Sequence, residues 1–436
     1  MDALGILPAP VTVRPAPGHP FLLTPDVRVV VGEEPDAVAV AVLVAARIGH
    51  LTEVPVAVVH TDDGAPGSIV LRLLGGQDVP SALTTLGADP ALPDGLAAEA
   101  YRLTVDEHRV EVVALSAAGL VRAAASLLQM AVPAAPWPYV RGGTVVDHPR
   151  LAWRGLLVDV SDHPLALPDA QALVNVMATV KLNVLHIRVA DTVAWLPDFL
   201  DEAGEVAGAF AELQAYATAR QIAVVPEIDV AGEALPDART AEVLGRVAAT
   251  TRAHVVHVGG RPAAADEVGR GCGERIGRAA DDVAAAGAVV MAWQCAASAL
   301  GAGGHLGHLL QVRDVADPAL GPAVAQGAVL VLSPPVLDLG DRAVSLRERW
   351  EADPLALAGA AGLPREAVRG VEVVLGGVHG GTREGLFAAL LPDLAAVAEA
   401  AWSGAGATSW SSFAARLAAE RARWAHLGLP VPPDAD

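Results

Sequence analysis

The stretch WRGLLVDVSDHPLALPDAQALVNVMATVKLNVLHIRVA (153–190) contains one copy of the repeating sequence pattern that decides the fold. Residues 153–161 and 182–190 are near-continuous apolar runs, as expected of strands that are covered on both faces. Residues 168–180, between them, have the length and apolar spacing of a helix. The stretch therefore predicts a strand, a helix and a second strand that runs parallel to the first.

The same alternation of predicted strands and helices continues toward the end of the chain. Further strands are predicted at IAVVPEIDV (222–230), HVVHVGG (254–260), VVMAWQC (289–295), HLLQVRD (308–314), VLVLSPP (329–335) and VEVVLGG (371–377). Helices are predicted between strands, for example over 210–220 and 275–287. Eight units in roughly 280 residues are what a (β/α)8 barrel needs. A doubly wound open sheet competes, but it more often has a glycine-rich phosphate turn after its first strand, which is absent here. We therefore predict an α/β protein with a (β/α)8 TIM barrel over residues 149–436.

Residues 1–148 have a different pattern and predict a small α+β domain. VRVVVG (27–32) and SIVLRLL (68–74) are predicted strands because of their β-branched content. Residues 34–51 between them have helical length and periodicity. YRLTVDEHRVEVVAL (101–115) predicts a hairpin, and an amphipathic helix is expected over 115–131.

Composition limits the possible functions. The chain has 436 residues and a net charge of −20, which argues against binding to nucleic acid or to an anionic membrane surface. The first residues show no signal-peptide pattern, and apolar stretches are interrupted before about 20 residues, so we expect a cytoplasmic protein without a membrane segment. The two cysteines, Cys272 and Cys295, form no metal motif.

Acidic residues stand at the ends of several predicted barrel strands, where the working face of such a barrel lies. Glu227 and Asp229 are two residues apart on one strand and therefore face the same side. With Asp159 and Asp191 they are expected to form a polar cluster, which a repurposed barrel enzyme could use with or without a divalent cation. No ligand spacing specifies a metal site, and His257, His305 and His308 form no HxxxH-type pair, so we predict no metal and no cofactor.

Several segments, in order, resemble one known family. HPRLAWRGLLVDVSDH (148–163), KLNVLHIRVADTVAW (181–195), PEIDVAGEA (226–234), HVGG (257–260) and LLPDLAAVAEAAWS (390–403) are similar to motifs of the family-20 glycoside hydrolases, the exo-acting β-N-acetylhexosaminidases. LPAPVTVRP (7–15), EAYRLTV (99–105) and SAAGLVRAAASLLQM (116–130) resemble that family's non-catalytic N-terminal domain. The resemblance covers nearly the whole chain.

The resemblance implies a particular chemistry. The family removes terminal N-acetylhexosamine with help from the substrate's own acetamido oxygen, not with two protein carboxylates in the usual scheme. An Asp-Glu pair directly after HxGG orients the acetamido group and supplies the general acid. Here those two positions hold Arg261 and Pro262. A guanidinium cannot act as a general acid near neutral pH, and proline has no suitable group.

Other pocket positions of the family are partly retained. The resemblance assigns sugar binding to four residues: Arg154, Asp191, Trp293 and Asp338. Replaced family positions are the third-strand His at Glu233, a wall Trp at Arg313, the acetamido-binding Tyr at Val336, and the last-strand Trp and Glu at Gly376 and Val378. The segments after the second and third strands also look shorter than those of the family.

These observations leave three hypotheses. The first is a β-N-acetylhexosaminidase-like protein with lost or strongly reduced activity that still binds an N-acetylhexosamine-type sugar at the barrel mouth. The second is an active hydrolase in which RPAAA is an insertion and Asp266 and Glu267 act as a displaced pair. Against it, Pro262 followed by AAADEV is also typical of a helix start, with acids near its N-terminal dipole. The third is the repurposed enzyme using Asp159, Asp191, Glu227 and Asp229.

Overall fold

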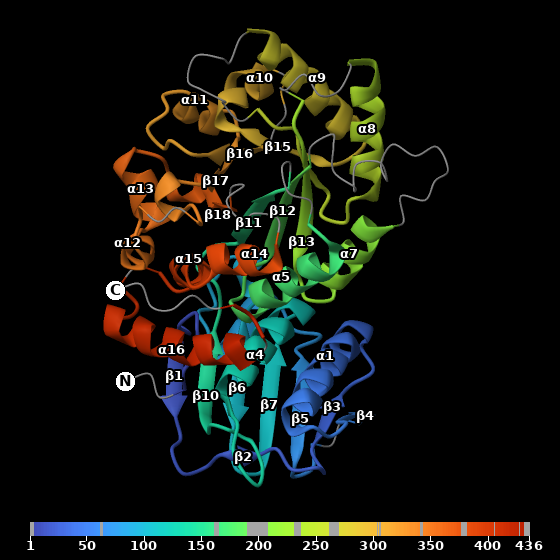
Figure 1. The fold of residues 1–436 in the computed structure, drawn as a ribbon, viewed down its shortest axis with the longest axis vertical. Coiled ribbons are helices and arrows are strands. Elements are labelled where there is room, and N and C mark those ends of the chain that lie inside the picture. The colour runs from blue at the N-terminus through green and yellow to red at the C-terminus, as the bar shows by residue number, and fades with distance from the viewer. Residues whose placement is uncertain are drawn as a thin grey trace.

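The eight apolar runs form a closed barrel of parallel strands, which follows an α+β domain (Figure 1). The computed structural model describes residues 4–61, 64–160, 165–189, 208–230, 237–260, 270–302, 304, 307–340, 343–375, 382–404, 406–426 and 428–430. The barrel strands are β11 (Trp153–Asp159), β12 (Val184–Val189), β13 (Ala223–Ile228), β14 (Val255–His257), β15 (Val289–Trp293), β16 (Leu309–Val312), β17 (Val329–Leu332) and β18 (Val368–Leu375). Neighbours in sequence are neighbours in the barrel, and β11 pairs with β18 to close it. The barrel prediction is confirmed, and the open doubly wound sheet is excluded.

Helices cover the outside of the barrel. They are α5 (Leu167–Thr179), α7 (Ala209–Thr218), α8 (Asp237–Thr250), α9 (Arg270–Ala285), α10 (Ala297–Ala302), α11 (Leu320–Ala325), α12 (Leu346–Glu351), α13 (Pro354–Ala360), α14 (Arg383–Leu390) and α15 (Asp393–Trp402). The last helix, α16 (Trp410–His426), passes beside the junction with the α+β domain (Figure 1). Apolar side chains from these helices and from the outward faces of the strands form the largest core cluster.

Residues alternate between the outside and the inside of the barrel because side chains of a strand point to opposite faces in turn. The lowest interior layer is apolar and consists of Trp153, Val184, Val225, Met291, Leu309 and Val331. The next inward positions on β12, β13, β14, β16 and β18 are polar and buried: His186, Glu227, His257, Gln311 and Glu372. A polar layer therefore lies inside the barrel, between the apolar floor and the mouth.

The α+β domain contains a seven-stranded mixed sheet in the order β1-β10-β6-β7-β5-β3-β4. Its strands are β1 (Thr12–Pro15), β3 (Arg28–Val31), β4 (Ala57–His60), β5 (Ser68–Leu73), β6 (Tyr101–Val105), β7 (Arg109–Ala114) and β10 (Gly143–Asp147). The short strands β2 (Phe21–Leu22), β8 (Ala131–Val132) and β9 (Tyr139–Val140) form a second sheet. The helices are α1 (Pro35–Thr52), α2 (Val79–Leu86), α3 (Asp94–Ala97) and α4 (Ala117–Met130). The predicted hairpin is the antiparallel pair β6 and β7.

Helix α1 is long and apolar enough, by length and composition, to cross a membrane, and α14 with α15 would also qualify if the pair, bent by 47°, were one span. In this fold, Val40, Val44 and Ile48 of α1 are buried in the core of the α+β domain. Core helices of this kind have the same composition as a membrane segment. The expected lack of a membrane segment stays a prediction.

Candidate functional site at the barrel mouth

Arg188 organises the described part of the barrel mouth. It follows His186 on β12 at the next inward position, and its guanidinium lies between carboxylates from β11 and β13. Nη1 donates to Asp159 Oδ2 at 3.0 Å, and Nη2 donates to Asp229 Oδ2 at 2.8 Å. Nε lies 3.7 Å from Glu227 Oε1. Three of the four acids predicted to cluster are therefore brought together, as expected, but around an arginine.

This arrangement changes what the cluster can do. Burial lowers the pKa of Arg188, but Glu227, Asp159 and Asp229 outweigh burial and raise it, so the guanidinium stays charged. Any divalent cation bound to these carboxylates would have to displace it. The clustering prediction is confirmed for Asp159, Glu227 and Asp229, while its use as a cation site is disfavoured.

Below Arg188, the polar layer is a connected network of buried side chains. His186 Nδ1 lies 2.7 Å from Glu372 Oε1, and its Nε2 lies 3.3 Å from Glu227 Oε2. Glu372 also accepts hydrogen bonds from Trp153 Nε1 and from Gln311 Nε2, each at 2.9 Å. All of these carboxylate and imidazole groups are fully buried. Such a network is stable only because opposite charges face one another.

The protonation states within this network follow from its geometry. Burial lowers the pKa of His186, but the carboxylates of Glu372 and Glu227 outweigh burial and raise it to about 9. Burial raises the pKa of Glu227, but His257, His186 and Arg188 reverse this and lower it to about 2. Burial is the main cause that lowers the pKa of His257, to about 4. Near neutral pH the layer thus contains a cationic His186, an anionic Glu227 and a neutral His257.

His186, Glu227 and His257 are the described residues whose ligand atoms lie close enough, within 4.8 Å, to hold a metal ion. The hydrogen bond that His257 accepts does not fit that role. His257 Nδ1 accepts a hydrogen bond from Gly259 N at 3.0 Å, so the hydrogen of the neutral ring is on Nε2. Nε2 therefore has no lone pair for a metal ion, and Nδ1 is already occupied.

The two glycines after β14 shape the mouth beside this network. Gly259 and Gly260 have φ angles of +82° and +87°, which favour glycine. A Cβ at Gly259 would collide with Asp229. Gly260 N donates to Asp229 Oδ1 at 3.2 Å, and Trp293 N donates to Gly259 O at 3.1 Å. The HVGG segment therefore packs closely against β13 and β15.

Trp293 and the Arg313–Asp338 pair occupy neighbouring positions at the mouth. The indole of Trp293 is 1% exposed and donates to Glu227 Oε1 at 3.2 Å. Arg313, which follows β16, makes a bidentate ion pair with Asp338, at 2.9 and 2.6 Å. Val336 lies in a 3-10 turn (Pro335–Leu337) and packs against the barrel core. The predicted sugar ligand Asp338 is thus at the mouth, but it is paired with an arginine of the same chain.

The structure corrects one predicted site residue. Arg154 is at the beginning of β11 and faces outward, because Trp153 and Gly155 on either side of it face the interior. Its guanidinium is fully buried and donates to Glu99 Oε2 at 2.5 Å, to Lys181 O at 2.9 Å and to Leu151 O at 2.7 Å. It therefore joins the lower end of the barrel to the α+β domain. The prediction that Arg154 binds a sugar is wrong.

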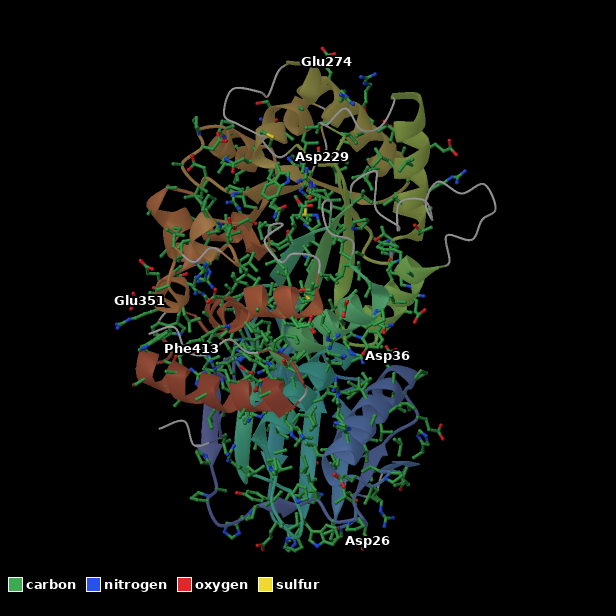
Figure 2. All side chains as sticks on the ribbon, viewed as in Figure 1. Asp26, Asp36, Asp229, Glu274, Glu351 and Phe413 are labelled. Atoms are coloured by element: carbon green, nitrogen blue, oxygen red, sulfur yellow. The ribbon has the colours of Figure 1, made fainter. Side chains whose placement is uncertain are left out.

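The remaining predicted positions fall outside the described residues. They are Asp191, Glu233, Arg261, Pro262, Asp266, Glu267, Gly376 and Val378. Figure 2 labels Asp229, which lies within the barrel half of the molecule, on the side away from the α+β domain. Sequence reasoning missed His186, Glu372 and Gln311 as a connected group. The signal was present, since each is a polar residue at an inward position of a mostly apolar strand.

Comparison with known proteins identifies the family to which this chain belongs. The chain is a (β/α)8 glycoside-hydrolase-type protein with a preceding α+β domain. The model of glycosyl hydrolase family 20, domain 2, matches residues 3–148, and that of the family 20 catalytic domain matches residues 151–199. A β-N-acetylhexosaminidase of Cellulomonas fimi is 33% identical over 510 aligned positions, covering 98% of this chain and 96% of the relative. The chain belongs to glycoside hydrolase family 20.

Solved structures confirm the fold. The family-20 β-N-acetylhexosaminidase from Streptomyces coelicolor superposes with a TM-score of 0.82 at 24% identity, covering 99% of this chain and 98% of that chain. The N-acetyl-β-hexosaminidase of Streptomyces plicatus, solved with Thio-NAglucal, has a TM-score of 0.81, also at 24% identity, with 100% and 97% covered. The alignment with the Cellulomonas relative is longer than this chain, so that relative contains segments with no counterpart here.

Proposed function

We propose that this β-N-acetylhexosaminidase-like protein binds an N-acetylhexosamine-type sugar at the barrel mouth and has lost most or all of the family's glycosidase activity. One observation carries the proposal. Three aspartates at the described mouth, Asp159, Asp229 and Asp338, are each engaged by Arg188 or Arg313. A general acid must instead hold a proton near neutral pH, which requires an environment that raises its pKa.

Glu227, a further described carboxylate near the mouth, does not fill this role. Glu227 is fully buried, accepts a hydrogen bond from Trp293, and has a pKa lowered to about 2, so it is ionised at any physiological pH. The sequence supports the same conclusion, because Arg261 and Pro262 directly follow HVGG where the family has its Asp-Glu pair. Similarity to the catalytic-domain model also ends at residue 199, before that segment.

Activity is tested with a chromogenic N-acetylglucosaminide and purified full-length protein between pH 5 and pH 8. We expect the wild type and Glu267→Gln to release product at the same rate as buffer. A family-20 enzyme with an intact Asp-Glu pair serves as the positive control. Release by the wild type that Glu267→Gln abolishes would overturn the loss of activity and support the displaced pair.

The active alternative has its own support. Identity of 33% over nearly the full length connects this chain to a protein named as a β-N-acetylhexosaminidase. On that alternative, Asp266 and Glu267 would perform the chemistry. A misplacement of about 1 Å costs on the order of a hundredfold in rate, so an insertion of five residues demands a compensating change in the chain path.

Retained sugar binding is tested separately by thermal unfolding in the presence of N-acetylglucosamine, with galactose as the reference sugar. We expect N-acetylglucosamine to raise Tm, because a ligand that binds only the native state stabilises it. Arg313→Gln combined with Asp338→Asn should abolish the increase. The matched control is Arg347→Gln with Glu351→Gln, an exposed ion pair on α12. No increase in Tm at any sugar concentration would contradict binding.

A further inference from the structure

Two arginines without a carboxylate partner meet at the lower end of the barrel. Arg47, on α1, donates through Nη2 to Asn175 Oδ1 at 3.0 Å. Arg220, between α7 and β13, donates through Nε to the same oxygen at 2.8 Å. Among the residues that the structure describes, neither forms an ion pair with an acid. The two guanidiniums form a locally cationic spot in a chain with a net charge of −20.

The pair is held in place by neighbouring groups. Tyr216 donates its hydroxyl to Asn175 Oδ1 at 3.1 Å and accepts a hydrogen bond from Asn175 Nδ2 at 2.8 Å. The Arg220 guanidinium lies 3.6 Å from the centre of the Tyr216 ring, and its Nη1 donates to Tyr216 O at 3.0 Å. Burial and the nearby Arg47 lower the pKa of Arg220, as expected when like charges approach one another. The amide oxygen, which already accepts three hydrogen bonds, provides no negative charge.

A cavity of about 70 Å³ adjoins this pair and is lined by Arg47, Asn175 and Arg220. The rest of the lining is mostly apolar and includes Val44, Val121, Leu128 and Ala178. It lies where α1 and α4 of the α+β domain meet α5 and α7 of the barrel (Figure 1). Arg47 Nε and Nη1 and Arg220 Nη2 have no hydrogen-bond partner among the described groups and are available to a ligand.

We propose that this junction is a binding site for a small monocarboxylate, with the carboxylate on Arg47 and Arg220 and a short alkyl chain in the apolar cavity. A planar carboxylate matches the fork geometry of guanidinium groups, and charge-assisted hydrogen bonds of this kind are strong. The cavity is several times larger than the minimum of about 10–15 Å³ that one water needs, so a chain of a few carbons fits. Such a ligand joins the α+β domain to the barrel at the end opposite the mouth, so this site is independent of the proposed sugar binding.

The test is calorimetric titration of the full-length protein with sodium butyrate, acetate and phosphate at constant ionic strength. We expect saturable binding with butyrate tighter than acetate, and a Kd weaker by about tenfold or more in Arg47→Gln and Arg220→Gln. Arg347→Gln, an exposed arginine on α12, is the matched control and should bind as the wild type does.

A second variant tests the apolar part of the site. Ala124→Leu places a larger side chain into the cavity lining and should remove the preference for butyrate over acetate while acetate still binds. The proposal is overturned if no carboxylate binds, if both arginine variants bind butyrate as tightly as the wild type, or if phosphate binds as tightly as butyrate. It is also overturned if Ala124→Leu keeps the full preference for butyrate.

Discussion

His186 makes the stability of this protein fall on the alkaline side of neutral pH. The imidazole is fully buried between Glu372 Oε1, at 2.7 Å, and Glu227 Oε2, at 3.3 Å, and its pKa is raised from 6.5 to about 9. The group is therefore protonated in the native state and neutral in the unfolded state throughout this interval. The stability that this proton contributes is fully present below pH 6.5 and is lost as the pH rises through 9.

The magnitude follows from the same interval. One proton bound only by the native state changes the free energy of unfolding by about 1.4 kcal/mol per pH unit. From pH 6.5 to 9 we therefore expect a loss of about 3 kcal/mol from this group. His257 does not contribute to this loss between pH 6.5 and pH 9. Its pKa is lowered to about 4, so its titration reduces the stability of the protein only as the pH falls below 6.5.

Urea unfolding followed by far-UV circular dichroism at intervals from pH 6 to pH 9.5 measures this loss. His186→Gln removes the titrating group, so its free energy of unfolding should be lower at pH 6 and should change little up to pH 9. His50→Gln, at an exposed position near the end of α1, should keep the wild-type slope. A wild-type stability that stays level from pH 6.5 to 9, or an unchanged slope in His186→Gln, would refute the assigned protonation state.

Three further substitutions test other parts of the structure by the same urea unfolding. Gly259→Ala should cost at least about 2 kcal/mol, because it combines a φ of +82° with a collision against Asp229, whereas Gly277→Ala in the open interior of α9 should stabilise by about 0.5–1 kcal/mol. Equal effects would contradict the close packing of the HVGG segment. Glu99→Gln should cost about 3–5 kcal/mol, since it leaves the buried Arg122 and Arg154 without a counter-charge, and a change below about 1 kcal/mol would contradict this role. Arg188→Gln should cost about 2–4 kcal/mol, and adding Asp229→Asn should recover part of that loss. No recovery would argue against charge pairing as the cause.

The architecture was predictable because each barrel strand reads as an apolar run of its own. Every predicted strand from 153–161 to 371–377 corresponds to a barrel strand, and all eight end earlier in the structure than predicted. The predicted strand 254–260, for example, is shortened to Val255–His257, since Gly259 and Gly260 adopt positive φ angles that end the ladder. Strand ends depend on backbone conformations that composition does not encode.

The site was harder to predict because it depends on which face of a strand each residue occupies. Arg154 and Asp159 lie on the same strand, but they are an odd number of residues apart and therefore face opposite sides. If Asp159 points into the barrel mouth, Arg154 must point outward. This alternation of faces can be counted in the sequence alone. The ion pairs of Arg188 could not be predicted in this way, because they depend on the register between β11, β12 and β13.

The polar layer and the mouth have separate physical roles, so a chain of this family can keep the fold even where its mouth no longer supports catalysis. His186 is paired with the opposite charges of Glu227 and Glu372 within the barrel, and this pairing does not require a substrate. At the mouth, an enzyme has to maintain unpaired carboxylates, which is unfavourable for folding. Pairing Asp159 and Asp229 with Arg188, and Asp338 with Arg313, removes that cost. Loss of activity would therefore leave the barrel stable, as proposed for this protein.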